Sequence, residues 1–238
     1  MRNQNRKSNQ IRNLTIETNV NAYAEGSCLI KFGNTHVLCT ATIEEKTPPF
    51  LRGKGSGWVT AEYNMLARST HQRNSRDPMK PNGRSIEITR LIGRALRSCV
   101  DLKKLGERQI IIDCDVLQAD GGTRCAAITG GYVALELAIE KILGKNFVKS
   151  DLLTNQICAI SCGIVNGEVL LDLDYNEDSK CEVDCNFVIN KNLDLIEVQG
   201  TAENGAMSFN QVAQMYNFAK EAAQEIFLAQ KEAIKKSH

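Results

Sequence analysis

Residues 109–143 read QIIIDCDVLQADGGTRCAAITGGYVALELAIEKIL, and this stretch decides the fold. Three isoleucines followed by the alternating letters DCDV predict a buried strand over Gln109–Gln118. The Ala-Asp-Gly-Gly that follows predicts a loop. The next run, rich in Ala, Leu and Ile, predicts a helix from Thr123 to about Leu143, with Thr123 at the N-cap position. The order is therefore strand, glycine loop, helix.

The segments before this stretch add strands and one more helix. Two β-rich runs, Ser27–Phe32 and Thr35–Glu44, are separated by Gly33-Asn34, which predicts a tight hairpin. A third strand is expected over Gly57–Tyr63. Apolar residues then recur at helical spacing, which predicts a helix from about Ser85 to Asp101.

The segments after it repeat the same order of strands and then a helix. Ser208 and Gln211 stand at capping-box spacing and announce a last helix. Because strands precede helices twice, we expect an α+β protein built from two halves of similar size, about 1–145 and 146–238, within one domain. The strands expected in the second half are Gln156–Val165, Glu168–Leu173, Glu182–Ile189 and Leu193–Gly200.

Composition excludes several classes of protein. The chain has 238 residues, of which 42% are hydrophobic and 24% charged, enough for one large domain or two small ones. Its net charge is only +1, so a polyanion has to be held by a local patch. No apolar run long enough for a membrane span and no export signal are present, and the nine cysteines form no CxxC pair. We expect a cytoplasmic protein with buried, reduced thiols and no membrane partner.

One stretch of the sequence is strongly basic. Between Arg68 and Arg97 there are eight Lys or Arg residues against two acids. Its first part carries Arg68, Arg73 and Arg76, lacks hydrophobic periodicity and lies beside prolines, which predicts an exposed basic loop. Such loops suit the phosphate backbone of nucleic acids. The alternative is a merely solvated loop.

Two further arginines stand where an anion would be attracted. Arg84 immediately precedes the helix expected at Ser85, and Arg124 lies in the first turn of the helix after Gly121-Gly122. Free backbone N–H groups and the helix dipole attract an anion there, and a guanidinium adds a bidentate donor. Otherwise the glycines only turn the chain.

The opposite charge gathers between Glu168 and Asp184, with seven acids and a single lysine. Asp178 and Asp184 are six residues apart, which allows both carboxylates to converge across a bend. Hard oxygen ligands without His or Cys favour Mg²⁺ or Mn²⁺. An acidic hairpin facing water is the alternative. A second acidic group, Asp113, Asp115 and Asp120, lies beside the glycine loop, where the first two could instead pair with an arginine.

Together these parts are what phosphoryl transfer requires. The three histidines have no ligand spacing, and neither a GxSxG nor a Walker sequence occurs, so a triad hydrolase or a P-loop enzyme is unsupported. The chain resembles the ribonuclease PH family in five motifs that stand in the family's order. They are PPFLRG at 48–53, GWVTAEY at 57–63, RLIGRALR at 90–97, DCDVLQADGGTR at 113–124 and EDS at 177–179.

The resemblance runs from Arg2 to the last helix and carries implications for fold and activity. It implies the ribosomal protein S5 domain 2-like fold of ribonuclease PH. It also implies a phosphate-dependent 3′-to-5′ exoribonuclease that trims the 3′ ends of tRNA precursors, and rRNA as a further substrate. Nucleoside 5′-diphosphates would be released, and the subunits would form a hexameric ring as a trimer of dimers.

The resemblance also assigns residues. Inorganic phosphate, the co-substrate, would be held by Arg84 and by the loop Gly122, Thr123 and Arg124. Asp178 and Asp184 would be the catalytic carboxylates and would hold Mg²⁺ or Mn²⁺; metal support is favoured for Asp184, and the proton donor stays open. RNA would be bound by Arg68, Arg73 and Arg76. One departure is Cys125, where relatives commonly carry Thr or Ser.

Two other functions stay open at this point. The chain could be a non-catalytic, RNA-binding ring subunit of an exosome-like assembly, although the presence of both arginines and both aspartates argues against it. It could also be a hydrolytic, metal-dependent nuclease that releases monophosphates and ignores added phosphate.

Overall fold

The computed structural model describes residues 2, 5–75, 83–143, 152–203 and 205–237. A five-stranded sheet forms in the first half, in the order β1-β2-β3-β5-β4. The hairpin across Gly33-Asn34 is confirmed, and Gly33 turns it with a φ of 53°. The strands are β1 (Leu14–Thr18), β2 (Gly26–Phe32), β3 (Thr35–Glu44), β4 (Trp58–Met65) and β5 (Gln109–Gln118).

Strand β5 lies between β3 and β4, antiparallel to the first and parallel to the second. The parallel pair needs a long crossover, which is supplied by α1 (Gly83–Arg97) and α2 (Leu102–Leu105). Helix α1 ends at Arg97, earlier than the expected Asp101. Two contacts stop the helix there: Val100 forms a bridge with the distant Leu153, and the Asp101 carboxylate accepts hydrogen bonds from two backbone N–H groups of α2.

A four-stranded antiparallel sheet forms in the second half, in the order β7-β6-β8-β9. Between β7 and β8 the chain makes one short helix, α4 (Tyr175–Asp178), which the sequence analysis did not predict. The last helix, α5 (Phe209–Lys236), begins at the predicted capping box of Ser208 and Gln211. The strands are β6 (Ile157–Val165), β7 (Glu168–Leu171), β8 (Val183–Asn190) and β9 (Leu195–Ala202).

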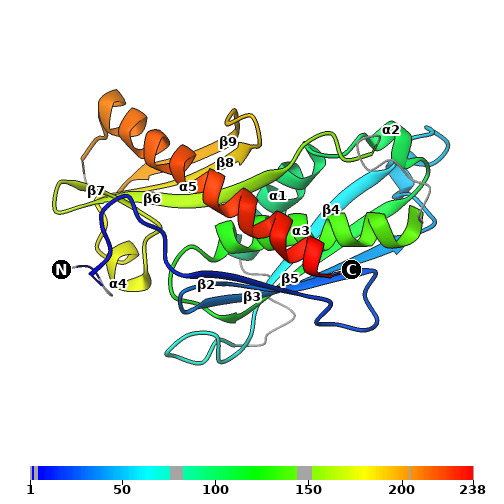
Figure 1. Cartoon of the computed structure of the whole chain (residues 1–238), viewed down its shortest axis with the longest axis horizontal. Coiled ribbons are helices and arrows are strands. Elements are labelled where there is room, and N and C mark those ends of the chain that lie inside the picture. Colours follow the sequence, from blue (N-terminus) through cyan, green and yellow to red (C-terminus); the bar gives the residue numbers. More distant parts are fainter. Residues whose placement is uncertain (1, 3–4, 76–82, 144–151, 204, 238) are drawn as a thin grey trace.

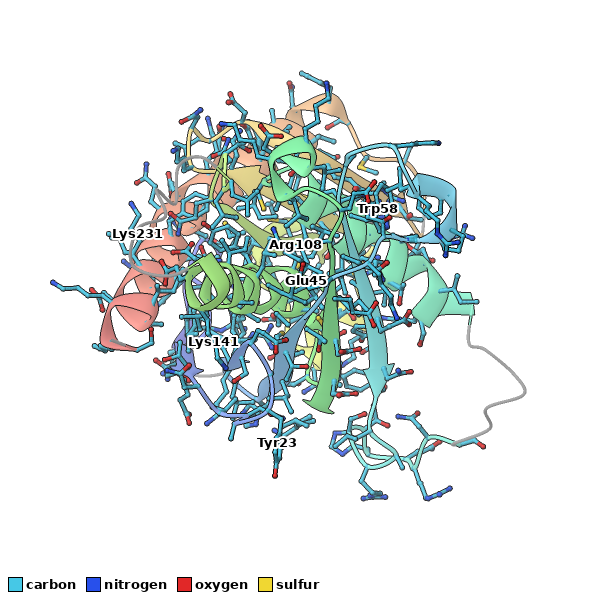
Figure 2. All side chains as sticks on the ribbon, turned by 90° about the vertical axis from the view of Figure 1, so that its right-hand side faces the viewer. Tyr23, Glu45, Trp58, Arg108, Lys141 and Lys231 are labelled. Atoms are coloured by element: carbon cyan, nitrogen blue, oxygen red, sulfur yellow. The ribbon has the colours of Figure 1, made fainter. Side chains whose placement is uncertain are left out.

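Helix α3 (Thr123–Leu143) lies between the two sheets, within the bounds that the sequence predicts. Figure 1 shows the first sheet at the lower right, the second at the upper left, and α5 crossing in front. Figure 2 looks nearly along α3 from the end that carries Lys141, with strands of the first sheet on one side and α5 on the other. Because α3 is covered on several sides, it is apolar around most of its circumference.

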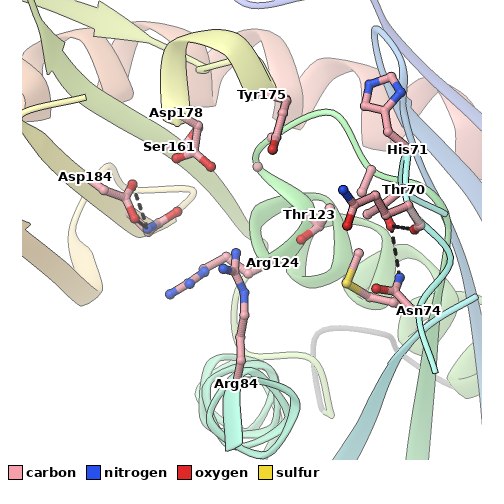
Figure 3. A pocket seen from close by; sticks show the side chains of 16 residues that line it. Thr70, His71, Asn74, Arg84, Thr123, Arg124, Ser161, Tyr175, Asp178 and Asp184 are labelled. Atoms are coloured by element: carbon pink, nitrogen blue, oxygen red, sulfur yellow. Dashed lines mark hydrogen bonds between the residues drawn. The ribbon is translucent and has the colours of Figure 1, made fainter. Parts of the chain in front are cut away.

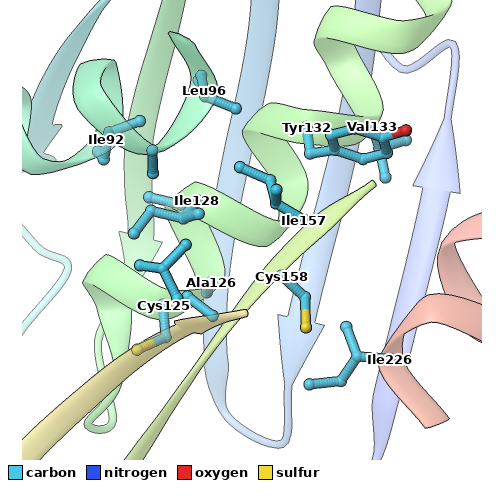
Figure 4. Close-up of a cluster of buried hydrophobic side chains, with 14 of the residues drawn as sticks. Ile92, Leu96, Cys125, Ala126, Ile128, Tyr132, Val133, Ile157, Cys158 and Ile226 are labelled. Atoms are coloured by element: carbon cyan, nitrogen blue, oxygen red, sulfur yellow. The ribbon is translucent and has the colours of Figure 1, made fainter. Parts of the chain in front are cut away.

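A large hydrophobic core joins the two halves. It takes Ile92 and Leu96 from α1, Ile128 from α3, Ile157 from β6 and Ile226 from α5 (Figure 4). All nine cysteines are buried and free, as expected from the sequence. No helix within the described ranges is long and apolar enough to cross a membrane.

Candidate active site

The glycine loop joins β5 to the first turn of α3. Gly121 and Gly122 have φ angles of 76° and 66°, in the left-handed region that favours glycine. A Cβ atom on Gly121 would stand 2.4 Å from the carbonyl oxygen of Leu173, so only glycine lets the loop approach the second half this closely. The loop therefore turns the chain, as the simpler interpretation has it, and also sits against the segment that leads to Asp178.

A cavity of about 520 Å³ opens at this loop. That volume is typical of a small-molecule site. Figure 3 shows Arg84 rising from α1 toward Arg124, while Asp178 and Asp184 face them from the second half. The structure thus brings together the two arginines, the two aspartates and the loop residues Gly122 and Thr123.

The first turns of two helices position the arginines. Arg84 is the second residue of α1, inside the helix and not just before it. The Arg124 guanidinium donates a hydrogen bond from Nη1 to Gln199 Oε1 at 3.1 Å and lies 3.5 Å from Glu87 Oε1. Gln199, on β9, had no signal in the sequence, because nothing in a strand pattern tells which of its polar residues faces a partner.

A tyrosine of the first sheet holds the side chain of Thr123. The hydroxyl groups of Tyr63 and Thr123 are 2.8 Å apart and form a buried hydrogen bond. Burial raises the pKa of Tyr63, while the bond to Thr123 lowers it, with a net rise. Tyr63 closes the GWVTAEY motif, which could have suggested a role for it.

One aspartate comes from the connection between β7 and β8, and the other from β8 itself. Asp178 is the last residue of α4, and Asp184 is the second residue of β8. Burial raises the pKa of Asp178, against the lowering effect of Arg84 and Arg124. Burial also raises the pKa of Asp184, and the neighbouring Asp178 adds to this effect. Both groups therefore hold a proton more readily than a solvated aspartate does.

Three of the other acids of this stretch, Asp172, Asp174 and Glu177, pair with arginines of the N-terminal segment. Arg12 is buried and donates to both carboxylate oxygens of Asp172, with Nη2 to Oδ1 at 2.7 Å and Nε to Oδ2 at 3.0 Å. The same guanidinium donates to the carbonyl oxygens of Asp120 and Gly121. Arg12 thus ties the glycine loop to the second half.

A second pair of arginines holds the residue before Asp178. Arg2 Nε donates to Glu177 Oε1 at 2.7 Å, and Arg6 Nη2 donates to Glu177 Oε2 at 3.3 Å. Arg6 also lies 3.9 Å from Asp174. The positive charges that balance these acids are therefore, in large part, arginines of this same chain.

The basic loop borders the cavity through its polar residues and not its arginines. Thr70, His71 and Asn74 are among the lining residues, whereas Arg68 and Arg73 are exposed and do not line the cavity. Arg76 lies outside the described residues. The loop is anchored by the Ala119 N–H, which donates to the Ser69 carbonyl at 2.8 Å.

Three other sequence-level candidates lie elsewhere. Asp113 and Asp115 on β5 do not line the cavity, and they make no ion pair with any described residue, so the alternative of a pairing with an arginine is not observed. Burial raises the pKa of both. Cys125 is buried, and its thiol donates to Asn186 Oδ1 at 3.1 Å.

The donor set near Asp178 and Asp184 fits Mg²⁺ or Mn²⁺ bound to a substrate. Over the described ranges, no three His, Cys, Asp or Glu side chains form a ligand cluster. Mg²⁺ is usually held by one or two carboxylates together with water and substrate phosphates, which two converging aspartates beside an anion site would provide. A closed all-protein metal cage is not what these residues form.

Comparison with known proteins identifies the family. Residues 10–139 match the model of the 3′ exoribonuclease family, domain 1, and residues 155–222 match domain 2. The ribonuclease PH of Cereibacter sphaeroides strain ATCC 17029 is 54% identical over 236 residues, which cover 98% of this chain and all of that protein. The ribonuclease PH of strain KD131 is equally similar, with 54% identity over the same length.

Two solved structures share the fold. The crystal structure of rice Rrp46 has a TM-score of 0.78 at 19% identity, covering 98% of this chain and 100% of that one. The Archaeoglobus fulgidus exosome with RNA bound to the active site has a TM-score of 0.78 at 21% identity, covering 94% of this chain and 91% of that one.

The chain belongs to the 3′ exoribonuclease family. Within that family its full-length similarity is to ribonuclease PH, and it is a phosphorolytic 3′-to-5′ exoribonuclease that uses phosphate as a substrate. The expected ribonuclease PH fold is confirmed.

Proposed function

We propose that orthophosphate binds between Arg84 and Arg124 and attacks the last phosphodiester of an RNA 3′ end in this cavity. The observation that carries the proposal is that two arginines, 40 residues apart in the sequence, line the same cavity as two half-buried aspartates. The N–H groups around Thr123, at the start of α3, add donors for the same anion.

The chemistry follows from the charges. Both reactants are anions, so the guanidinium groups offset their repulsion. Attack in line with the 3′-oxygen breaks the P–O bond to the shortened RNA and forms a P–O bond to phosphate, giving a nucleoside 5′-diphosphate. The departing oxygen needs a proton. Because burial raises the pKa of Asp178 and Asp184, either carboxyl is a better donor at neutral pH than a solvated one.

Asp178 and Asp184 would also hold Mg²⁺ or Mn²⁺. When bound, the ion would supply positive charge to the transferring phosphoryl group. We assign metal support mainly to Asp184, because Asn186 Nδ2 donates to both of its carboxylate oxygens at 3.3 Å and orients them. Asp178, at the end of α4, is left as the candidate proton donor.

We propose tRNA precursors with 3′ extensions as the main substrate and rRNA as a further one. Arg68 and Arg73 are exposed on the loop that borders the cavity, where they can contact phosphates upstream of the 3′ end. We place Arg76 in the same role from its position in the sequence. Arg73→Ala should weaken RNA binding, and the logarithm of affinity should fall less steeply with salt.

We propose a hexameric ring, built as a trimer of dimers, as the working assembly. The support is similarity to ribonuclease PH and a fold shared with exosome subunits. Size-exclusion chromatography with light scattering measures the mass, and a stable monomer with full activity on tRNA precursors would contradict this part.

The site is tested with a short 3′-extended RNA incubated with and without phosphate. We expect diphosphates only when phosphate is present, and a rise of roughly tenfold or more in KM for phosphate in Arg124→Ala. Arg108→Ala is the matched control, because Arg108 pairs with the exposed Glu45 at the opposite end of β5 from the glycine loop (Figure 2). Release of monophosphates without phosphate would indicate hydrolysis instead. An inert wild-type protein that still binds RNA would indicate a non-catalytic ring subunit.

A further inference from the structure

Ser161 of β6 is a buried residue at the edge of the cavity that the roles given above do not use. It is 4% exposed and lines the cavity together with Arg124 and Asp184. In the antiparallel pair of β6 and β8, Ser161 is opposite Asn186, and Gly163 is opposite Asp184. Directly opposed residues place their side chains on the same face of a sheet. Ser161 therefore shares its face with the catalytic candidate Asp184.

The hydroxyl of Ser161 has no hydrogen-bond partner in the protein. Among the described residues, the buried side-chain polar atoms without a partner are Ser161 Oγ and Arg6 Nε. A buried hydroxyl left unpaired is destabilising, and native proteins pair nearly all such groups. Arg6 Nε belongs to a guanidinium that is held through its other nitrogens, whereas Ser161 has only this one polar atom in its side chain.

Polar neighbours of Ser161 are already bonded to one another. The Asn186 amide donates to Asp184, and its oxygen accepts from the Cys125 thiol. Asp172 accepts from Arg12 through both of its oxygens. These groups are held in place by their own partners, which leaves the cavity as the side on which Ser161 Oγ can find one.

The cavity side of Ser161 faces the glycine loop. A Cβ atom built on Gly122 would lie 3.6 Å from Ser161 Oγ, so the hydroxyl stands directly across from the loop that begins α3. Gly122 has no side chain to cover the hydroxyl, and the Arg12 guanidinium borders the same point, with Nη2 3.1 Å from the built Cβ. An anion held by the backbone of this loop would come within reach of the hydroxyl.

We propose that Ser161 Oγ donates a hydrogen bond to an oxygen of the orthophosphate held at Gly122, Thr123 and Arg124. This inference rests on the phosphate site proposed above and adds a neutral donor from the second half to a phosphate site whose other proposed ligands all come from the first. The RNA phosphodiester under attack also has oxygens that could accept this hydrogen bond. The experiment below therefore distinguishes orthophosphate from the phosphodiester as the acceptor.

Ser161→Ala removes the donor with little change in volume. We expect KM for phosphate in phosphorolysis to rise roughly tenfold, since hydrogen bonds to charged groups are the strong ones. KM for RNA should stay within about twofold. An unchanged KM for phosphate overturns the inference, and so does a rise confined to KM for RNA, which would assign the hydroxyl to the phosphodiester.

Thr129→Val is the matched control. Thr129 is also a buried hydroxyl in contact with β6, but its Oγ1 donates to the Ala159 carbonyl and accepts from the Ala159 N–H, at 3.3 and 3.0 Å. Thr129→Val should lower the melting temperature and leave KM for phosphate unchanged. Without phosphate, Ser161→Ala should melt no lower than wild type. Added phosphate should raise its melting temperature by less than it raises that of wild type. If phosphate raises the melting temperature of Ser161→Ala as much as that of wild type, the inference is contradicted.

Arg124→Ala, measured in parallel, separates the two proposals. A raised KM for phosphate in Arg124→Ala together with an unchanged value in Ser161→Ala removes only the role of Ser161. Unchanged values in both variants remove the phosphate site itself.

Discussion

Asp178 and Asp184 share a cavity with two arginines, yet the pKa of each carboxyl is raised, because burial outweighs the nearby positive charge. Residues that catalyse proton transfer often have pKa values shifted toward neutrality in this way. The sequence predicted the pair from spacing and charge. The burial of the two carboxylates depends on how the surrounding elements pack, and no spacing rule gives it.

Asp184→Asn should abolish most turnover and stabilise the unliganded protein. We expect the rate to fall by roughly 10²-fold or more with RNA still bound. Because the folded pKa lies above the unfolded value, ionisation of Asp184 destabilises the folded state as pH rises, so the variant should melt higher at neutral pH. Melting curves in a chelating buffer should converge with wild type below the unfolded pKa, near 3.8. Full activity of Asp184→Asn would refute the assignment.

Tyr63→Phe tests whether the bond to Thr123 orders the glycine loop. Loss of this buried bond should lower the free energy of unfolding by about 1 kcal/mol and raise KM for phosphate several-fold, with kcat nearly unchanged. Tyr216→Phe is the control, because its hydroxyl donates to the Leu193 carbonyl at 2.5 Å and does not line the cavity. Equal kinetics in the two variants would contradict a role for Tyr63 in phosphate binding.

Among the helices, the long α3 is predictable from the sequence and the short α4 is not. Helix α3 has the predicted bounds, since a run of helix-forming residues after a glycine loop leaves few alternatives. Helix α4 is only four residues long, which is too short for any periodicity. It is held by a capping box between Asp174 and Glu177, and by Arg2 and Arg6 from the other end of the chain. Such long-range support is invisible to a local pattern.

Glu177→Gln tests that support. Burial alone would raise the pKa of Glu177, but hydrogen bonds from Arg2 and attraction to both arginines lower it overall. A lowered folded pKa gives stability that is present above the unfolded value, near 4.5, and is lost as pH falls through the folded value. The variant should therefore lose about 1.5–3 kcal/mol at pH 7 and match wild type in strong acid. We expect kcat to fall as well, because Asp178 is the next residue.

At the scale of the whole molecule, the active site exists only where the two halves meet. The first half supplies both arginines and the glycine loop, and the second supplies both aspartates. The sequence predicted two halves and the residue types in each, because those depend on local patterns. The interface is not predictable from the sequence, where Arg12 is one of several basic residues near the N-terminus, and only the fold places it against Asp172 and the loop carbonyls.

Arg12→Ala should therefore weaken the contact between the two halves and lower the free energy of unfolding. Removing Arg12 leaves the buried Asp172 carboxylate with only the more distant Arg6, at 4.0 Å, as an ion-pair partner among the described residues, which costs about 3 kcal/mol. Denaturant unfolding followed by circular dichroism measures the loss. Lys31→Ala is the control, since its pair with Glu17 is exposed and should contribute less than about 1 kcal/mol. Similar losses in the two variants would contradict the importance of the Arg12 contact.

The nine cysteines give this molecule a built-in reporter of opening. Each thiol is covered in the folded chain, and burial raises the pKa of Cys99 to about 12 and of Cys185 to about 11, which suppresses the reactive thiolate. A colorimetric thiol reagent should consequently react with almost no thiol in the native state and with all nine after denaturation. Since the cysteines are spread over both sheets and α3, the order in which they become labelled would trace which part of the protein loosens first.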